Sequence, residues 1–276
     1  MLYLSHSPGP PLDRFVDRFW LLTGAQTPRK ERILPGGTSE LVVNLRENEI
    51  RIHDPARPDR CKRFSGAILS GAYSRTFACD ANQHESIVGV HFKPGGASPF
   101  LDEMASDLAD SHADLADLWG RAAGELRERL CESTTPQQRF RIMERALMDR
   151  LLCRPSRSSH PALAAALTLF GPEGTGGSVR AVAREIGLCE RRFIQVFSTQ
   201  VGLTPKLFCR LLRFQRARAL AQRRVDWTQL ASACGYYDQS HLIRDFQEFS
   251  GASPTEYVQQ IQQGRWLKDS HMPLAD

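Results

Sequence analysis

The sequence lacks the features that would place it in a membrane or in an oxidising compartment. No stretch approaches the roughly 20 consecutive apolar residues that a membrane helix needs, and no apolar signal segment follows the first four residues. The seven cysteines are scattered, odd in number and without a Cys-x-x-Cys pair, which argues against a disulfide framework and a thiolate zinc site. We therefore expect a cytoplasmic protein that does not contact a membrane.

Signatures of catalysis are also scarce. The one glycine-rich stretch is not followed by Gly-Lys-Ser/Thr, so the chain has no P-loop. His53, His84 and His91 fall in or near predicted strands, but the His-x-His spacing of cupin-type metal sites is absent. No acid–base group accompanies Cys61 or Cys79, the alternative reactive or methyl-accepting thiols. The sequence thus predicts no catalytic residue, no metal and no cofactor, with metal catalysis and a reactive thiol as the weaker alternatives.

The chain does contain an internal repeat, with one copy at residues 183–208 and the other at residues 231–257. Turn glycines, buried apolar residues and a helix-starting proline recur at an offset of 48 positions and then of 49, because one residue is added in the second turn. Each copy reads as a short helix, a glycine turn and a second helix, which is a helix-turn-helix. The paired positions are Ala183/Ala231, Gly187/Gly235, Phe193/Leu242, Phe197/Phe246, Gly202/Gly251, Pro205/Pro254 and Phe208/Tyr257.

Helical periodicity predicts which side chains the second helix of each copy turns outward. Such outward Arg and Gln side chains suit the major groove of double-stranded DNA, where Arg can bond guanine and Gln adenine. The alternative is an ordinary solvated face. The predicted DNA-binding residues are Arg191, Arg192, Ile194, Gln195 and Ser198 in the first copy, and Gln239, Ser240, His241 and Arg244 in the second.

Charge is divided unequally between the two copies. Residues 180–224 contain eleven Arg or Lys against two Glu, a formal charge of +9, whereas residues 225–262 carry −4. Because DNA affinity comes largely from neutralising phosphates, we expect the first copy and the helix after it to supply most of the binding energy. The second copy would contribute register, some base reading or a surface for RNA polymerase.

The double motif resembles the AraC/XylS family of bacterial transcription regulators. The resemblance covers about 100 residues, from near His160 to near Gln262, and is most specific in residues 235–242 (Gly-Tyr-Tyr-Asp-Gln-Ser-His-Leu). Residues 213–217 are similar to the helix that joins the two motifs in that family. Cys189 stands where the family usually has a capping serine. Membership would imply a DNA-binding regulator, most often an activator that recruits RNA polymerase, and not an enzyme.

The first half is predicted to mix strands with helices. Apolar runs between turn signals predict strands at 40–45, 49–53, 67–69 and 87–92, the first two paired as a hairpin, and helical periodicity predicts helices at 115–131 and 136–152. Residues 34–45 and 88–97 are similar to a sensory domain found in a subset of AraC/XylS regulators. That likeness implies an unknown small-molecule effector. The two helices would form the seam of a homodimer or simply cover a monomeric core.

The expected fold is α+β in two domains. A β-rich sensory domain with a helical layer spans residues 1–153, and the polar, proline-bearing segment 154–160 is a linker. An all-α tandem helix-turn-helix domain spans 161–262, and a tail follows at 263–276. An architectural DNA binder without regulatory role would not need so large a partner domain.

Overall fold

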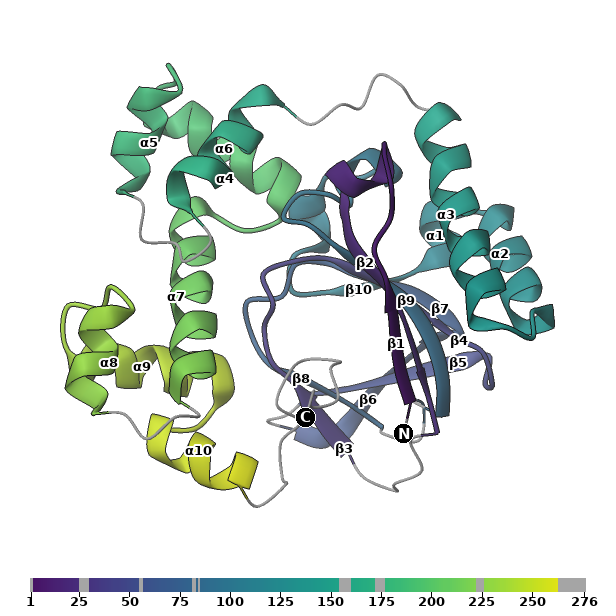
Figure 1. Cartoon of the computed structure of the whole chain (residues 1–276), viewed down its shortest axis with the longest axis horizontal. Helices are drawn as coiled ribbons and strands as arrows, with labels where there is room; N and C mark the ends of the chain where they lie inside the picture. The colour runs from purple at the N-terminus through teal and green to yellow at the C-terminus, as the bar shows by residue number, and fades with distance from the viewer. Residues whose placement is uncertain are drawn as a thin grey trace.

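A computed structural model describes residues 2–24, 30–54, 57–80, 83, 85–153, 160–171, 177–221 and 226–262. Strands and three helices build the N-terminal half of these residues, and helices build the C-terminal half (Figure 1). The fold is therefore α+β, with a β-rich first part and an all-helical second part, as predicted. Within the described ranges, none of the helices has the length and apolar composition needed to cross a membrane.

A six-stranded antiparallel sheet forms the centre of the N-terminal half. Its middle strands are almost continuous apolar runs because elements cover both of its faces. The predicted strands at 40–45, 67–69 and 87–92 all lie in this sheet and are confirmed. In spatial order the strands are β1 (Leu2–His6), β2 (Val16–Thr23), β9 (Ser86–Phe92), β4 (Glu40–Asn44), β7 (Ala67–Ser70) and β10 (His112–Asp114).

A second, four-stranded antiparallel sheet packs against the first. Its order is β3 (Lys30–Ile33), β8 (Phe77–Asp80), β5 (Glu49–Asp54) and β6 (Arg57–Ser65). The strand at 49–53 is confirmed, but its predicted pairing with 40–45 is wrong. Both edges of β4 are occupied, by β7 and β9. The Asn44 side chain also accepts hydrogen bonds from the Arg46 and Glu47 amides, both at 2.9 Å, and this turns the chain toward the other sheet.

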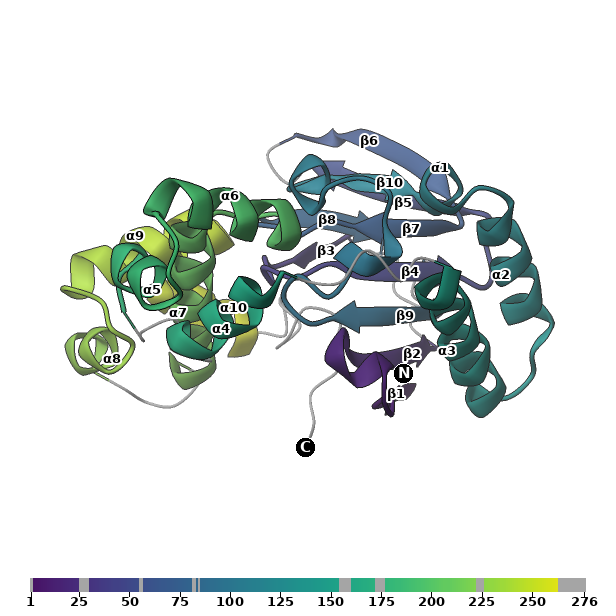
Figure 2. The same cartoon turned by 90° about the horizontal axis from the view of Figure 1, so that it is seen from above.

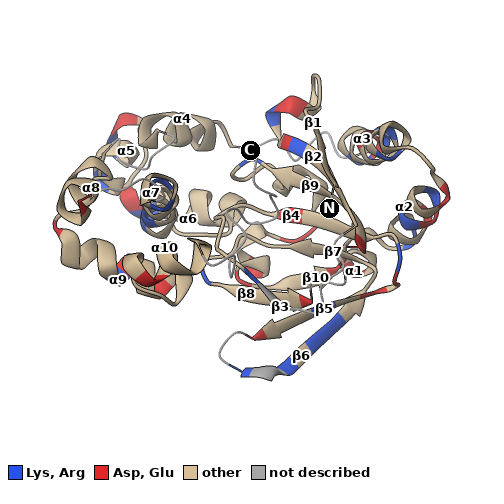
Figure 3. Ribbon diagram, turned by 60° about the horizontal axis from the view of Figure 1, so that its bottom comes forward, with Lys and Arg blue, Asp and Glu red and all other residues tan. Residues whose placement is uncertain are grey.

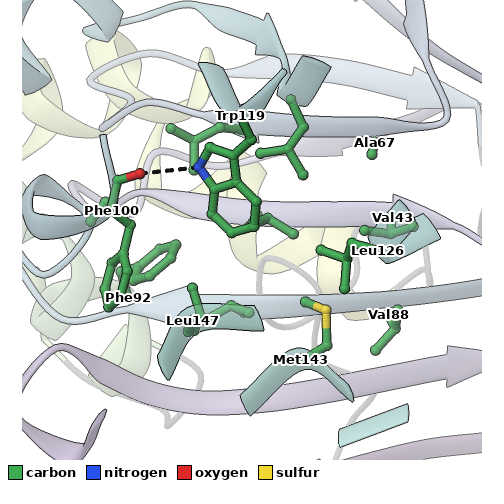
Figure 4. Close-up of a cluster of buried hydrophobic side chains, with 14 of the residues drawn as sticks. Val43, Ala67, Val88, Phe92, Phe100, Trp119, Leu126, Met143 and Leu147 are labelled. Carbon is green, nitrogen blue, oxygen red and sulfur yellow. Dashed lines mark hydrogen bonds between the residues drawn. The ribbon is translucent and has the colours of Figure 1, made fainter. Parts of the chain in front are cut away.

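Three helices cover the outer face of the six-stranded sheet. They are α1 (Leu115–Trp119), α2 (Arg121–Glu132) and α3 (Pro136–Cys153). The single helix predicted at 115–131 is broken because Gly120 takes φ +59°, which ends α1 and reorients α2. The Trp119 indole donates to the Phe100 carbonyl at 3.0 Å, and Met143 and Leu147 of α3 pack beside it in the apolar core (Figure 4).

Seven described helices form the C-terminal half, where the sequence predicts them. The first helix-turn-helix and its support pack around Phe170, Phe193 and Phe197, and the second around Phe214 and Phe246. The 17-residue α7 belongs to both clusters and joins the two motifs. The helices are α4 (Pro161–Phe170), α5 (Val179–Glu185), α6 (Glu190–Val201), α7 (Pro205–Ala221), α8 (Trp227–Ala233), α9 (Gln239–Ser250) and α10 (Pro254–Gln262).

The two halves lie side by side, with α4–α10 on one side of the sheets and α1–α3 on the other (Figures 1 and 2). Leu34 of the N-terminal half is buried in the core cluster of the second motif. Gln215 of α7 donates to the Gly36 carbonyl at 2.7 Å. A Cβ placed on Gly37 would meet Leu211 at 3.4 Å, and one on Gly95 would meet Leu163 at 2.5 Å. Each Pro-Gly-Gly turn noted in the sequence thus lies against the helical half.

Candidate nucleic-acid interface

The first helix-turn-helix consists of α5, a turn at Gly187 and α6. Ser178 accepts a hydrogen bond from the Ala181 amide at 3.2 Å and so caps the start of α5. Gly187 takes φ +72°, where a side chain would strain the backbone. Phe193 and Phe197 of α6 are almost completely buried. The turn and these two rings fix the orientation of α6 and leave its other face outside.

Most of the residues predicted for the first motif do lie on that outer face. Arg191, Arg192 and Gln195 are exposed, and Ile194 is half-buried beside them. Arg192 donates to the Gln195 side-chain oxygen at 3.0 Å. This bond holds the Gln195 side chain against the helix surface. The Arg191 guanidinium makes no ion pair with any of the described residues. Arg191 is therefore the best placed of these residues to donate to a base edge or a phosphate.

Ser198 departs from the prediction that it projects outward. Its hydroxyl oxygen is buried and has no hydrogen-bond partner within the described residues. Ser198 lies in the last turn of α6, and that end of the helix packs on the N-terminal half, where Gly202 approaches Ala72 and the Ala105 carbonyl. Helical periodicity could not show this, because the covering residues are about a hundred positions away in the sequence.

The second motif repeats the geometry of the first with stronger caps. Asp226 accepts from the Thr228 amide at 2.7 Å and starts α8, and Asp238 accepts from the His241 amide at 2.7 Å and starts α9. Gly235 forms the turn with φ +73°. Ser178 and Asp238 are thus the N-caps of α5 and α9. Two carboxylates at helix N-termini are stabilised by the backbone dipoles there.

The residues predicted for α9 form a smaller and less charged surface. Ser240 and Arg244 are exposed, whereas Gln239 and His241 are half-buried. The His241 ring meets the edge of Tyr236 with 5.1 Å between centroids, and this contact orients the imidazole. Arg244 is the single Arg or Lys within residues 226–262. The second motif therefore presents mainly neutral hydrogen-bonding groups.

The structure adds three surface residues to the candidate interface. Arg180 and Arg184 of α5 are exposed and line a groove of about 500 Å³ between α5 and the start of α6. Tyr237, in the turn before α9, is 93% exposed. The two arginines belong to the basic stretch in the sequence, but their placement beside α6 depends on the turn at Gly187. A large exposed aromatic side chain at a motif turn marks a contact surface.

Internal ion pairs change the simple charge balance of the two motifs. Asp245 of α9 is 1% exposed and lies 2.6 Å from the Arg210 guanidinium of α7. Arg210 also pairs with Glu248. One of the eleven basic residues is thus used inside the domain, and two acidic residues of α9 are partly neutralised by it. The exposed positive charge of the first motif still exceeds that of the second.

The residues weighed as metal ligands lie apart. His53 is on β5 of the four-stranded sheet and His91 on β9 of the six-stranded sheet, and His84 lies outside the described residues. His91 contacts Glu40 and Thr38, both at 3.2 Å. Across the described ranges, no group of three His, Cys, Asp or Glu side chains could hold a metal ion.

Substituting Cys189 by serine is expected to stabilise the first motif. Cys189 is the N-cap of α6 and makes no side-chain hydrogen bond there. A serine hydroxyl would accept from an amide of the first turn, and this is worth about 1 kcal/mol. We expect the midpoint of thermal unfolding to rise by a few degrees. Cys131→Ser, an exposed cysteine in the last turn of α2 and not at a helix N-terminus, is the control, and an equal rise in that variant would contradict the capping explanation.

Two protein families together match most of the described chain. Residues 182–260 match a family described as "Helix-turn-helix domain", and residues 4–114 match "Domain of unknown function (DUF6597)". "Probable transcriptional regulator LumQ" of Photobacterium leiognathi is 32% identical over 81 residues. That match includes 29% of this chain and 33% of LumQ, so the chain spans about a third of the length of this curated relative.

Solved structures of regulators align with the chain at low similarity. A transcriptional regulator with an AraC-type DNA-binding domain from Chromobacterium violaceum is 26% identical over 37% of this chain and 94% of its own, with a TM-score of 0.33. ToxT from Vibrio cholerae is 9% identical over 94% of this chain and 98% of its own, with a TM-score of 0.46. LumQ is named a transcriptional regulator, in agreement with the class of protein predicted from the sequence.

The helical half contains two helix-turn-helix motifs, each with a capped helix and a glycine in its turn. The matched family covers both motifs. Its N-terminal neighbour falls in a family without an assigned function. The C-terminal part of the chain is therefore an AraC-type helix-turn-helix domain, a DNA-binding module.

Proposed function

We infer that the protein is a sequence-specific transcription regulator that places α6 and α9 in successive major grooves. The observation that carries this proposal is the repeated geometry: the turn glycines Gly187 and Gly235 and the closing glycines Gly202 and Gly251 all take positive φ, between 72° and 91°. α7 separates the two motifs by about 25 Å at 1.5 Å per residue. That spacing suits two recognition helices about one turn of B-DNA apart, roughly 34 Å.

The proposed domain organisation follows the elements. Residues 1–153 would sense a signal and residues 161–262 bind DNA, with a linker at 154–160 of which residues 154–159 lie outside the described structure. The tail at 263–276 also lies outside it. The exposed faces of α2 and α3 are the proposed seam of a homodimer. We further propose that the protein is an activator that recruits RNA polymerase in the cytoplasm. The name of the relative LumQ supports only a role in transcription regulation.

Contacts between the halves support control of DNA binding by the sensory half. Leu34 and Ala72 share an apolar cluster with the second motif, and Gln215 bonds the Gly36 carbonyl. The end of α6 packs beside Ala105. A signal that shifts these N-terminal residues would change the position of both recognition helices, because α7 connects them.

The test is an unbiased selection from a random double-stranded DNA library with the purified full-length chain. The full chain is used because Leu34 is part of the core of the second motif, and an isolated C-terminal fragment would lose it. We expect enrichment of a sequence with two short elements about 10 base pairs apart. Arg191→Ala/Gln195→Ala is the matched control and should lose preference for one element only. Recovery of no preferred sequence by the folded chain would overturn the proposal.

A further inference from the structure

A cavity of about 690 Å³ lies in the N-terminal half, outside both helix-turn-helix motifs. The strands β5 and β6, the segment from Tyr73 to Phe77 and the segment from Asp110 to His112 line it. Pockets for small molecules commonly have volumes between about 300 and 1,000 Å³. The size of this cavity therefore suits an organic molecule rather than a single ion.

Aromatic rings form one wall of the cavity. Tyr73 lies 4.6 Å from Phe77 and 4.8 Å from His112 between ring centroids, and Phe77 lies 4.7 Å from His112. Phe64 of β6 adds a fourth ring, 5.8 Å from His112. Rings at these distances favour stacked or edge contacts with another ring. The wall therefore fits an aromatic group.

The cavity narrows beyond these rings. The space that continues between the two sheets has a volume of about 30 Å³, and Ile52, Phe77 and His112 border both parts. A volume of that size holds about one water molecule. A long alkyl chain cannot enter it without repacking the core, so the ligand must be compact.

Positive charge lies at the mouth of the cavity. Side chains on a strand alternate between its two faces, so Arg60, Lys62 and Phe64 of β6 share the face that lines the cavity. Figure 3 shows the Lys and Arg residues along β6. Arg60 and Lys62 are exposed, and no ion pair is found for either among the described residues. The nearby Asp110 instead accepts hydrogen bonds from the Ser74 amide and hydroxyl, both at 2.7 Å. Of the other charged residues that line the cavity, Arg75 pairs with Asp110, so Arg60 and Lys62 outnumber Asp54 and favour an anionic group.

We propose that this cavity binds a small aromatic carboxylate, and that this molecule is the effector of the regulator. The carboxylate pairs with Arg60 and Lys62, and the ring lies against Tyr73 and Phe77. The assignment as effector rests on the proposed function, whereas the binding itself does not.

The cavity is connected to the DNA-binding half through one short segment. Tyr73, Thr76 and Phe77 line the cavity, while the neighbouring Ala72 is buried in the core of the second motif. The Thr76 hydroxyl donates to the Phe249 carbonyl at the end of α9, at 2.8 Å. A ligand held against Tyr73 and Phe77 therefore touches the segment that contacts the second recognition helix.

Calorimetric titration of the full-length chain tests the proposed ligand class. The probes are 4-hydroxybenzoate, neutral 4-hydroxybenzyl alcohol, which has the same phenol ring without the carboxylate, and octanoate as an aliphatic acid. We expect 4-hydroxybenzoate to bind best, with the alcohol about tenfold weaker and octanoate weaker still. Equal binding of the neutral alcohol, or tighter binding of octanoate, would overturn the ligand class.

Two variants locate the site. Lys62→Ala should weaken 4-hydroxybenzoate about tenfold. Arg63→Ala, the adjacent residue whose guanidinium instead lies 2.9 Å from Glu49, should leave it unchanged. Equal losses in the Lys62 and Arg63 variants would place binding elsewhere and overturn the proposal.

Failure of the proposed ligand class can be distinguished from failure of the proposed function. If none of the acids binds at about 10 mM while the chain still selects a DNA sequence, the ligand class is wrong and the regulator stands. If 4-hydroxybenzoate binds to the cavity but no DNA sequence is selected, the site is correct and its role as an effector site is wrong.

Discussion

Arg191→Ala is expected to weaken binding to the selected operator about ten- to a hundredfold, and Arg244→Ala by less than about fivefold. A guanidinium that bonds a guanine edge contributes about 1–3 kcal/mol. Arg191 is exposed on α6 beside three other exposed arginines of the first motif, Arg180, Arg184 and Arg192. Arg244 is alone in the second motif. The first motif therefore offers both the base contact and the surrounding phosphate contacts.

The acidic residues of the second motif account for the smaller effect expected there. Asp238 is occupied as the N-cap of α9, and Asp245 and Glu248 face Arg210. Their charges are partly compensated, so they do not prevent binding. Arg244 is, however, the single basic side chain of the second motif that can displace counterions from DNA. Counterion release gives DNA binding its dependence on salt.

Affinities measured over a series of salt concentrations distinguish the two motifs. Losing one phosphate contact should lower the slope of log affinity against log salt by about one, and this is expected for Arg184→Ala but not for Arg244→Ala. Arg121→Ala removes the same charge from α2, where the side chain is 93% exposed and pairs with Glu125, and should change neither quantity. Equal losses of affinity with equal slopes in the Arg191 and Arg244 variants would refute the unequal division of binding energy.

The helical half could be predicted from the sequence because its signals are local. Ser178, Gly187 and the apolar positions that follow lie within about 20 residues of one another, and each has one structural meaning in a helix-turn-helix. The placement of α5, α6, α8 and α9 follows directly. Ser198 is the exception, since the N-terminal half covers the end of α6 where it lies.

The strands were harder to predict because pairing partners lie far apart in the sequence. β2 pairs with β9, about 70 residues later, and β10 pairs with β7, more than 40 residues earlier. β6 carries Arg60, Lys62 and Arg63 and reads as a polar loop, yet it forms the edge of the four-stranded sheet. Charged residues are common on edge strands, where they discourage further pairing. Local apolar periodicity therefore identified β4, β5, β7 and β9, and it missed the edge strands together with β2 and β8.

Two Pro-Gly-Gly turns are visible in the sequence, but only the structure shows that they lie at the contact between the two halves. The Pro-Gly-Gly turns at residues 35–37 and 94–96 read as ends of strands, and they are that. Gly37 also lies against Leu211, and Gly95 lies so close to Leu163 that a Cβ would clash with it at 2.5 Å. The absence of side chains at both turns lets the helical half pack closely, and a single sequence cannot distinguish this role from that of an ordinary turn.

Arg210→Met is expected to destabilise the C-terminal domain by about 3 kcal/mol, which is the largest effect on stability predicted for a single side chain of the interface. Asp245 is 1% exposed and lies 2.6 Å from the Arg210 guanidinium. Hydrogen bonds with Glu248 and with Asp245 raise the pKa of Arg210 further above its ordinary value, so the guanidinium stays charged. Removing the arginine leaves a carboxylate buried without its partner, and such changes typically cost about 3–5 kcal/mol.

A second variant distinguishes the cost of leaving the Asp245 carboxylate without its partner from the cost of losing the packing of the Arg210 side chain. Arg210 also lies over the Phe249 ring, 5.0 Å from its centroid, and methionine keeps most of that apolar contact. In Arg210→Met/Asp245→Asn the buried group is neutral, so most of the lost stability should return. The free energies of unfolding of the wild type, both single variants and the double variant form a cycle that measures the coupling. If the double variant is as unstable as Arg210→Met alone, the ion pair does not hold α9 against α7. The fixed spacing between the two recognition helices must then depend on the apolar contacts of Phe214 and Phe246.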